Sequence, residues 1–144
     1  MFELDPDSRL SAWSEFRNGL NYSNSPLEDV IEFWSNAPFI PYNRNVDPFN
    51  QYAWPTPWEI IVENRYDDFT KALMMSWTLK LTDKFKDSRI EIKTYTDDEH
   101  NKVYNIVVID DTSVINYNDN SLISVHELSA SIRLENLIEV VRPR

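Results

Sequence analysis

Residues 67–83 read DDFTKALMMSWTLKLTD, and this stretch decides the fold. Large apolar side chains, from Phe69 to Leu81, fall on nearly every face of the helix that it predicts. A helix that is apolar all round has to be enclosed by other elements. Aspartate is a good helix-starting residue, and its carboxylate also suits the helix dipole. We therefore expect a buried central helix that begins at Asp67 or Asp68.

Three earlier segments predict helices by their first residues. Each places a capping residue before a proline: Asp5-Pro6, Ser25-Pro26 and Thr56-Pro57. The second and third also carry glutamate at the third helical position, Glu28 and Glu59, which predicts a capping box in each. The stretch WPTPWE at 54–59 is thus interpreted as a helix start, with a proline-rich recognition ligand as the alternative. The first helix is expected to end at Asn18-Gly19.

Strand patterns replace helical spacing after Lys86. Apolar and polar residues alternate in RIEIKTYT (89–96), and VYNIVVID (103–110) and DTSVINY (111–117) follow as further strands. Helices followed by strands predict an α+β fold, with N-terminal helices packed on a C-terminal antiparallel meander of three to four strands. We expect a single domain over 1–144, helical over about 1–86 and a sheet over about 87–144. Residues 121–144 fit either a helix or a final strand, and a strand or an irregular segment is favoured.

Charge and composition exclude several function classes. The chain has 24 acidic and 14 basic residues and a net charge of −10, which disfavours binding to nucleic-acid phosphates and to anionic membranes. The absence of cysteine excludes disulfides, thiolate metal sites and a cysteine nucleophile. The N-terminus has no signal-peptide pattern, and no apolar run is long enough to span a bilayer, so we expect a soluble cytosolic protein.

Glycine is almost absent, since Gly19 is the only one. Phosphate-binding loops, dinucleotide fingerprints and the serine nucleophile elbow all need several glycines, so none of them is expected. Turns that require a positive φ have to use asparagine or aspartate instead. The asparagines in predicted turns are Asn43, Asn45, Asn101, Asn118 and Asn120.

The two histidines do not predict a catalytic site. His100 lies in the polar turn DDEHN, where exposure is expected, and with Asp97, Asp98 and Glu99 it could instead hold a metal ion. One short loop without glycine is a poor cage for calcium, so no metal site is predicted. His126 lies near an apolar stretch, where a satisfied structural histidine is expected.

Adjacent carboxylates are also weak candidates. Asp67-Asp68 and Asp110-Asp111 are neighbours in sequence and should point apart, which suits a helix cap and a strand end. A glycosidase pair with one acid from each is the alternative. We predict no catalytic residue and no cofactor.

Aromatic residues gather in the first 80 positions, where all five tryptophans occur. The stretch PFIPYNRNVDPFNQYAWP (38–55) is expected to form an ordered extended loop packed by its own side chains. Its aromatics either cap the core or anchor a partner, because Trp and Tyr are common anchors of binding surfaces. The predicted partner-binding residues are Phe39, Tyr42, Phe49, Tyr52 and Trp54.

Three stretches carry a family resemblance. LEDVIEFWSNAPFIPYNRNVDPFNQYAWPTPWEII (27–61), YDDFTKALMMSWTLKLTD (66–83) and VVIDDTSVINY (107–117) resemble uncharacterised small proteins of contractile-tailed marine phages, above all cyanophages. The resemblance covers about residues 8–118. It implies a non-enzymatic virion structural or assembly protein of the head–tail junction, tail or baseplate, located in the virion or the host cytoplasm.

The partners that this resemblance implies are other virion proteins, which an acidic chain would meet through basic surfaces. A homo-oligomeric ring is one arrangement that fits, and no nucleic acid or membrane is involved. The alternative is an early phage protein that binds and inhibits a host factor.

A second resemblance concerns the order of elements. A buried helix followed by strands that end in VINY is similar to the transglutaminase-like cysteine peptidases. In that family the helix starts with the nucleophilic cysteine, and the histidine and aspartate follow on strands. The matching positions are Asp67 or Asp68, then Tyr104 or Asn105, then Asn116. None of them is the required residue, so the resemblance implies an inactive relative; a hydrolase with altered residues would instead need His100 or His126 to meet a carboxylate in a cleft.

Overall fold

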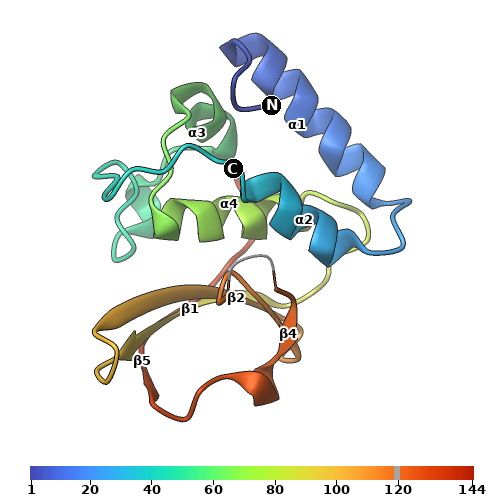
Figure 1. The fold of residues 1–144 in the computed structure, drawn as a ribbon. Helices are drawn as coiled ribbons and strands as arrows, with labels where there is room; N and C mark the ends of the chain where they lie inside the picture. Colours follow the sequence, from blue (N-terminus) through green and yellow to red (C-terminus); the bar gives the residue numbers. More distant parts are fainter. Residues whose placement is uncertain (119–120) are drawn as a thin grey trace.

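The computed structural model describes residues 1–118 and 121–144, which form a helical layer over a curved sheet (Figure 1). The helices are α1 (Pro6–Leu20), α2 (Pro26–Trp34), α3 (Pro57–Glu63) and α4 (Asp68–Lys80), with a short 3-10 turn at Gln51–Ala53. All four precede the sheet in sequence, which confirms the predicted α+β fold. Across the described residues, no helix combines the length and the apolar character needed to cross a membrane.

Helix α4 lies between the other helices and the sheet, as predicted (Figure 1). Ten of its thirteen residues are buried. The indole N–H groups of Trp13 and Trp34 both donate to the Thr78 hydroxyl oxygen, at 3.1 and 3.2 Å. That hydroxyl donates in turn to the carbonyl oxygen of Met74 at 2.6 Å. The buried Thr78 hydroxyl is therefore fully hydrogen-bonded, and its bonds connect α1 and α2 to α4.

The predicted capping box at the start of α3 is confirmed. The Thr56 hydroxyl accepts from the Glu59 backbone N–H at 3.3 Å, and the Glu59 carboxylate accepts from the Thr56 N–H at 2.9 Å. Helix α1 is capped by Asp5, whose carboxylate accepts from the Ser8 N–H at 3.0 Å. WPTPWE is a helix start.

Two helix-end predictions are wrong. The Ser25 side chain caps nothing, because its backbone (φ −140°, ψ 61°) lies outside the extended region that capping residues favour. The Ser23 hydroxyl instead accepts from the Ser25 N–H and donates to the Asp29 carboxylate. Helix α1 does not stop at Gly19, which has no positive φ, but continues to Leu20.

The sheet has five antiparallel strands in the order β4-β3-β2-β1-β5. They are β1 (Ile90–Asp97), β2 (Lys102–Ile109), β3 (Ser113–Ile115), β4 (Ile123–Ser124) and β5 (Ile132–Glu139). The number exceeds the predicted three to four, and the arrangement is not a simple meander. After β4 the chain crosses to the opposite edge, where β5 pairs with β1. The favoured final strand in residues 121–144 is thus confirmed.

Strand β2 is the middle strand of the sheet. Val107 and Ile109 pack into the main core under the helices. Ile106 and Val108 form a second, smaller core on the other face. The sheet is consequently buried on both sides around β2.

Positive φ angles in the described residues all belong to asparagine or aspartate, namely Asn64, Asn101, Asp110, Asp111 and Asn116. This confirms the expectation from the missing glycines. Strand β2 ends at Ile109, so the two aspartates form the turn that follows it rather than the strand end. Asn43, Asn45 and Asn118 do not use a positive φ. The prediction for Asn120 lies outside the described residues.

Candidate functional site

Asp67 and Asp68, at the start of α4, have different hydrogen-bond partners. Asp67 is buried, and one carboxylate oxygen accepts from the Thr70 N–H at 2.7 Å and from the Thr70 hydroxyl at 2.6 Å. The other oxygen accepts from the Asn43 N–H at 2.8 Å. Asp67 is therefore the helix cap, and it also fixes the 38–55 loop to the start of α4.

Asp68, the first residue of the helix, points to the sheet. Its carboxylate accepts from the side-chain amide of Asn105 at 2.9 Å and from that of Asn116 at 3.4 Å. The Asn116 amide also donates to the Asn105 carbonyl oxygen at 2.7 Å, and the Thr94 hydroxyl donates to the Asn105 amide oxygen at 2.9 Å. We call Asp68, Asn105 and Asn116 the cleft cluster.

The sheet geometry explains how the two amides reach Asp68. Asn105 is two residues before Val107, so alternation places it on the sheet face that meets the helices. Asn116 follows Ile115, which already occupies that face, and regular strand geometry would turn Asn116 away. Its left-handed φ of 65° breaks the alternation and brings its amide back to Asp68.

A cavity of about 480 Å³ opens beside this cluster, between α2, α4, β2 and the end of β3. Its walls include Ile31, Ser35, Asp68, Lys71, Met75, Lys102, Val103, Tyr104, Asn116, Tyr117 and Asn118. The Lys102 ammonium lies 4.8 Å from the centre of the Tyr104 ring, and the rings of Tyr104 and Tyr117 are 4.8 Å apart. We call this cavity the cleft.

The cleft cluster can bind and orient but does not form a nucleophile–base pair. Its two amides are hydrogen-bond donors and acceptors that do not titrate, so neither can take a proton from a nucleophile. Asp68 is its single ionisable member, and both of its oxygens already accept hydrogen bonds.

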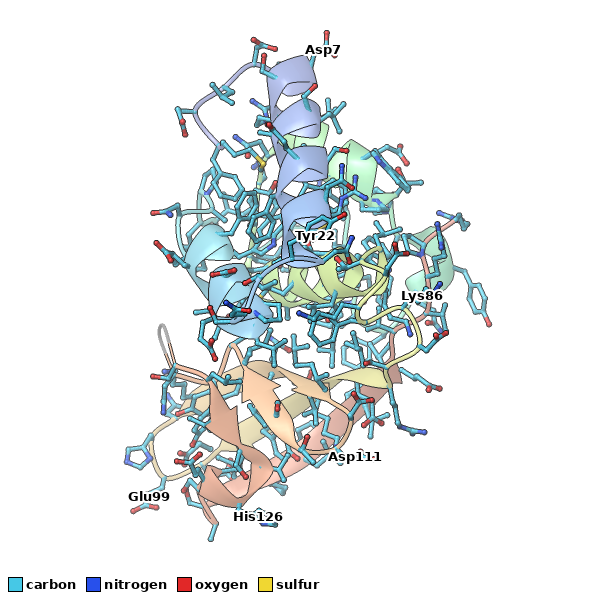
Figure 2. All side chains as sticks on the ribbon, turned by 90° about the vertical axis from the view of Figure 1, so that its right-hand side faces the viewer. Asp7, Tyr22, Lys86, Glu99, Asp111 and His126 are labelled. Atoms are coloured by element: carbon cyan, nitrogen blue, oxygen red, sulfur yellow. The ribbon has the colours of Figure 1, made fainter. Side chains whose placement is uncertain are left out.

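The histidines lie outside this cleft. The His100 ring nitrogen is 2.9 Å from an Asp97 carboxylate oxygen, and the other oxygen accepts from the backbone N–H groups of Glu99 and His100. The hydrogen bond to the Asp97 carboxylate raises the pKa of His100, and the same contact lowers the pKa of Asp97. His126 is exposed rather than a satisfied core residue, and Figure 2 shows it pointing away from the helices. Neither histidine lines the cleft, so the arrangement that the altered-hydrolase alternative requires is not seen among the described residues.

Atoms of Asp97, Glu99 and His100 able to bind a metal lie within 4.8 Å of one another. Both Asp97 oxygens are engaged in the turn, however, and the His100 side chain is 67% exposed. Glycosidase chemistry from Asp68 and Asp111 is not favoured either, because Asp111 is exposed in the β2–β3 turn (Figure 2).

The aromatic loop is ordered by backbone pairing. The Ile40 N–H donates to the Tyr66 carbonyl at 2.9 Å, and the Tyr66 N–H donates to the Pro38 carbonyl at 3.2 Å. Four predicted partner-binding side chains are exposed by 69–86%: Phe39, Tyr42, Phe49 and Tyr52. Their binding role stays a prediction.

Trp54 does not belong to that surface. Its side chain is only 6% exposed, because it packs against Phe69 and Trp77 in the core. Its indole N–H donates to the Asp47 carbonyl at 2.6 Å and so closes the loop on itself. The sequence could not separate this buried ring from its exposed neighbours, because all five have similar aromatic character.

The cleft cluster was found only through the resemblance to transglutaminase-like peptidases. That resemblance gave pairs of candidates, and of these the structure brings Asp68, Asn105 and Asn116 into contact. Residue reasoning alone missed Lys71, Thr94 and Lys102. The available signal was Asn105, a polar residue inside an otherwise apolar strand.

Comparisons with known proteins match this chain by its structure and not by its sequence. No family model matches the chain, and no curated protein matches its sequence. Two solved structures of Legionella pneumophila LapG match, one of them calcium-bound, with TM-scores of 0.69 for the calcium-bound form and 0.70. Both are 16% identical in sequence, and the matches cover 92% of this chain and 75% and 73% of those chains. At this level of identity the match concerns the fold, and this chain therefore shares the fold of the two LapG structures.

Proposed function

We propose that this chain is a non-catalytic protein of transglutaminase-like fold, which acts by holding a segment of another protein in its cleft. One observation carries the proposal. Asp68, Asn105 and Asn116 are hydrogen-bonded together at the three positions where the family resemblance puts cysteine, histidine and aspartate. In this proposal the three positions stay in contact with one another but carry residues that lack the chemistry of the family.

The chemical argument is that hydrolysis by this fold needs a thiolate and an imidazole. The sequence has no cysteine, and its two histidines lie elsewhere. An amide at position 105 cannot accept the proton of a nucleophile. What the cluster retains is a fixed set of polar groups beside a cavity, which is typical of a binding site.

A direct test compares the chain with its Asp68→Asn variant on peptide and protein substrates. We expect no cleavage by either protein, by mass spectrometry of the products after long incubation. Cleavage by the unchanged chain that disappears in Asp68→Asn would refute the proposal, because it would make Asp68 a catalytic residue.

A second test asks whether the three positions are equivalent to the family's catalytic set. We compare Asp68→Cys alone with the triple variant Asp68→Cys, Asn105→His, Asn116→Asp. The single variant should react with iodoacetamide as an ordinary thiol, with a pKa of about 8.5. In the triple variant a neighbouring imidazolium should lower the pKa of the introduced thiol to about 7.5 or below. Equal pH profiles in two folded variants would argue against the assigned positions.

The phage resemblance predicts a more specific role, that of a structural or assembly protein of a virion. A non-catalytic binding protein is compatible with a virion structural or assembly role, and the four exposed aromatics of the loop would serve as anchors. Mass spectrometry of purified particles tests it, with a fixed copy number relative to the capsid protein as the expected result. Presence in infected cells but absence from particles would instead favour a binder of host proteins.

A further inference from the structure

We infer that the cleft prefers a carboxylate-bearing segment, so its occupant is an acidic stretch of a partner protein. This rests on the proposed function, because it names the ligand class of the same cleft. It also differs from the expectation for the whole surface, whose negative charge favours basic partners.

The charges around the cleft carry the inference. Acidic residues outnumber basic ones by 24 to 14 in the chain, yet among residues 1–118 and 121–144 the charged side chains that line the cleft are Lys71, Lys102 and Asp68. The carboxylate of Asp68 is already bound by the amides of Asn105 and Asn116. The described lining of the cleft thus has two cations and one anion, whereas acids are in excess over the chain as a whole.

Neither lysine is neutralised by the protein. Among the described residues, no ion pair involves Lys71 or Lys102. Lys102 lies over the Tyr104 ring, a contact that leaves the outer side of the ammonium free to bind an anion. Some other cations of the chain do have protein partners: Arg89 pairs with Glu91, and Lys80 donates to two backbone carbonyls.

The neutral groups of the cleft suit the same ligand. Tyr104 and Tyr117, whose rings are tilted at 43° to each other and also pack against the second core, line the cleft together with Ser35. A volume of about 480 Å³ falls in the range of ordinary ligand sites and has room for a few residues of an extended chain.

A peptide carboxylate is favoured over a nucleic acid because the positive region is small. Two lysines can pair with one or two carboxylates, whereas a long phosphate backbone would also meet the remaining acidic surface. The net charge of −10 thus restricts anion binding to a short segment placed in the cleft.

The test uses three peptides of equal length, each acetylated and amidated at its ends: tetraglutamate, tetraglutamine and tetralysine. The full chain, labelled with ¹⁵N, is titrated with each at low ionic strength, and amide shifts are followed by NMR. We expect saturable shifts around Lys71, Lys102 and Asn116 with tetraglutamate and none with the other two. Lys71→Ala and Lys102→Ala should each weaken binding by roughly three- to fivefold, as expected for loss of one partly exposed charge contact.

Lys86→Ala is the matched control, because Lys86 is exposed and does not line the cleft (Figure 2). It should leave the affinity for tetraglutamate unchanged. Equal or stronger binding of tetraglutamine or tetralysine in the cleft would overturn the carboxylate preference and leave the proposed binding function standing. Tetraglutamate shifts that are unaffected by Lys71→Ala and Lys102→Ala, or no shifts at all, would also overturn the inference. The proposed lack of catalysis is tested separately by the cleavage assays.

Discussion

Two carboxylate clusters in this protein look alike and differ in how they are made. In the β1–β2 turn, Asp97 is held mainly by groups two and three residues along the chain, the backbone of Glu99 and the backbone and ring of His100, with one longer contact of 3.4 Å from the Ser131 hydroxyl. At the start of α4, Asp68 is held by amides that are 37 and 48 residues away. Most contacts of the first cluster form within one hairpin, whereas the second exists only when helix and sheet have come together. The second therefore reports on the tertiary fold, and the first on local structure.

The largest effect is expected at Asp67, where local and long-range contacts combine. Asp67→Ala removes the helix cap and leaves the buried N–H of Asn43 and the Thr70 groups without their partner. We expect a loss of about 3 kcal/mol in the free energy of unfolding, measured with urea. The control Asp5→Ala removes an exposed, purely local cap and should cost about 1 kcal/mol. Equal losses of unfolding free energy in Asp67→Ala and Asp5→Ala would show that the long-range contact of Asp67 adds nothing to its local cap.

A smaller effect is expected at Asp68. Asp68→Asn keeps the shape but replaces one acceptor oxygen by a donor that faces an amide of Asn105 or Asn116. The loss of one partly buried charge-assisted hydrogen bond should cost about 1–2 kcal/mol. Asp7→Asn, an exposed acid in the first turn of α1, is the control and should change stability by about 0.3 kcal/mol or less. A loss at Asp68 no larger than at Asp7 would show that the cleft cluster adds little to the fold.

The capping box of α3 is a purely local interaction, and we expect its removal to cause a loss of stability of intermediate size. Thr56→Ala removes the acceptor for the Glu59 N–H and should lower the free energy of unfolding by about 1 kcal/mol. Thr56→Ser keeps the hydroxyl and should stay within a few tenths of a kcal/mol of the unchanged protein. A destabilised Thr56→Ser variant would mean that the methyl group, and not the cap, stabilises this turn.

The smallest effect is expected from the Asp97–His100 pair, and it depends on pH. Because the folded pKa of His100 is raised, its contribution is complete below the unfolded pKa of about 6.5 and is lost as pH rises through the folded value. The folded pKa of Asp97 is lowered, so its contribution is complete above about 3.9 and is lost as pH falls through the folded value. The pair should thus stabilise the turn most between about pH 4 and 6.5.

NMR titration of the His100 ring in the unchanged protein and in Asp97→Asn tests this. The pKa of His100 should fall when the carboxylate is removed. An equal His100 pKa in the two proteins would mean that the contact does not persist in solution.

The same distinction explains how much of the molecule could be predicted. Thr56 and Glu59 are three residues apart, and the alternation that defines β1 spans eight residues, so short windows contain both signals. The pairing of β5 with β1 and the meeting of Asp68 with Asn116 depend on the packing of distant segments, which no short window contains. The order of elements, compared with a known family, supplied what local patterns could not. Trp54 shows the remaining limit, because its burial depends on Trp77 and Phe69 in another element.

The use of asparagine and aspartate at every described left-handed position has a consequence for the unfolded chain. Glycine has more conformational freedom than any other residue, and each replacement of glycine by another residue reduces the entropy of the denatured ensemble. A chain with a single glycine in 144 residues therefore loses less conformational entropy when it folds. The strain of the five left-handed residues opposes this gain. Part of the stability of the native protein therefore comes from the restricted conformational freedom of its denatured state.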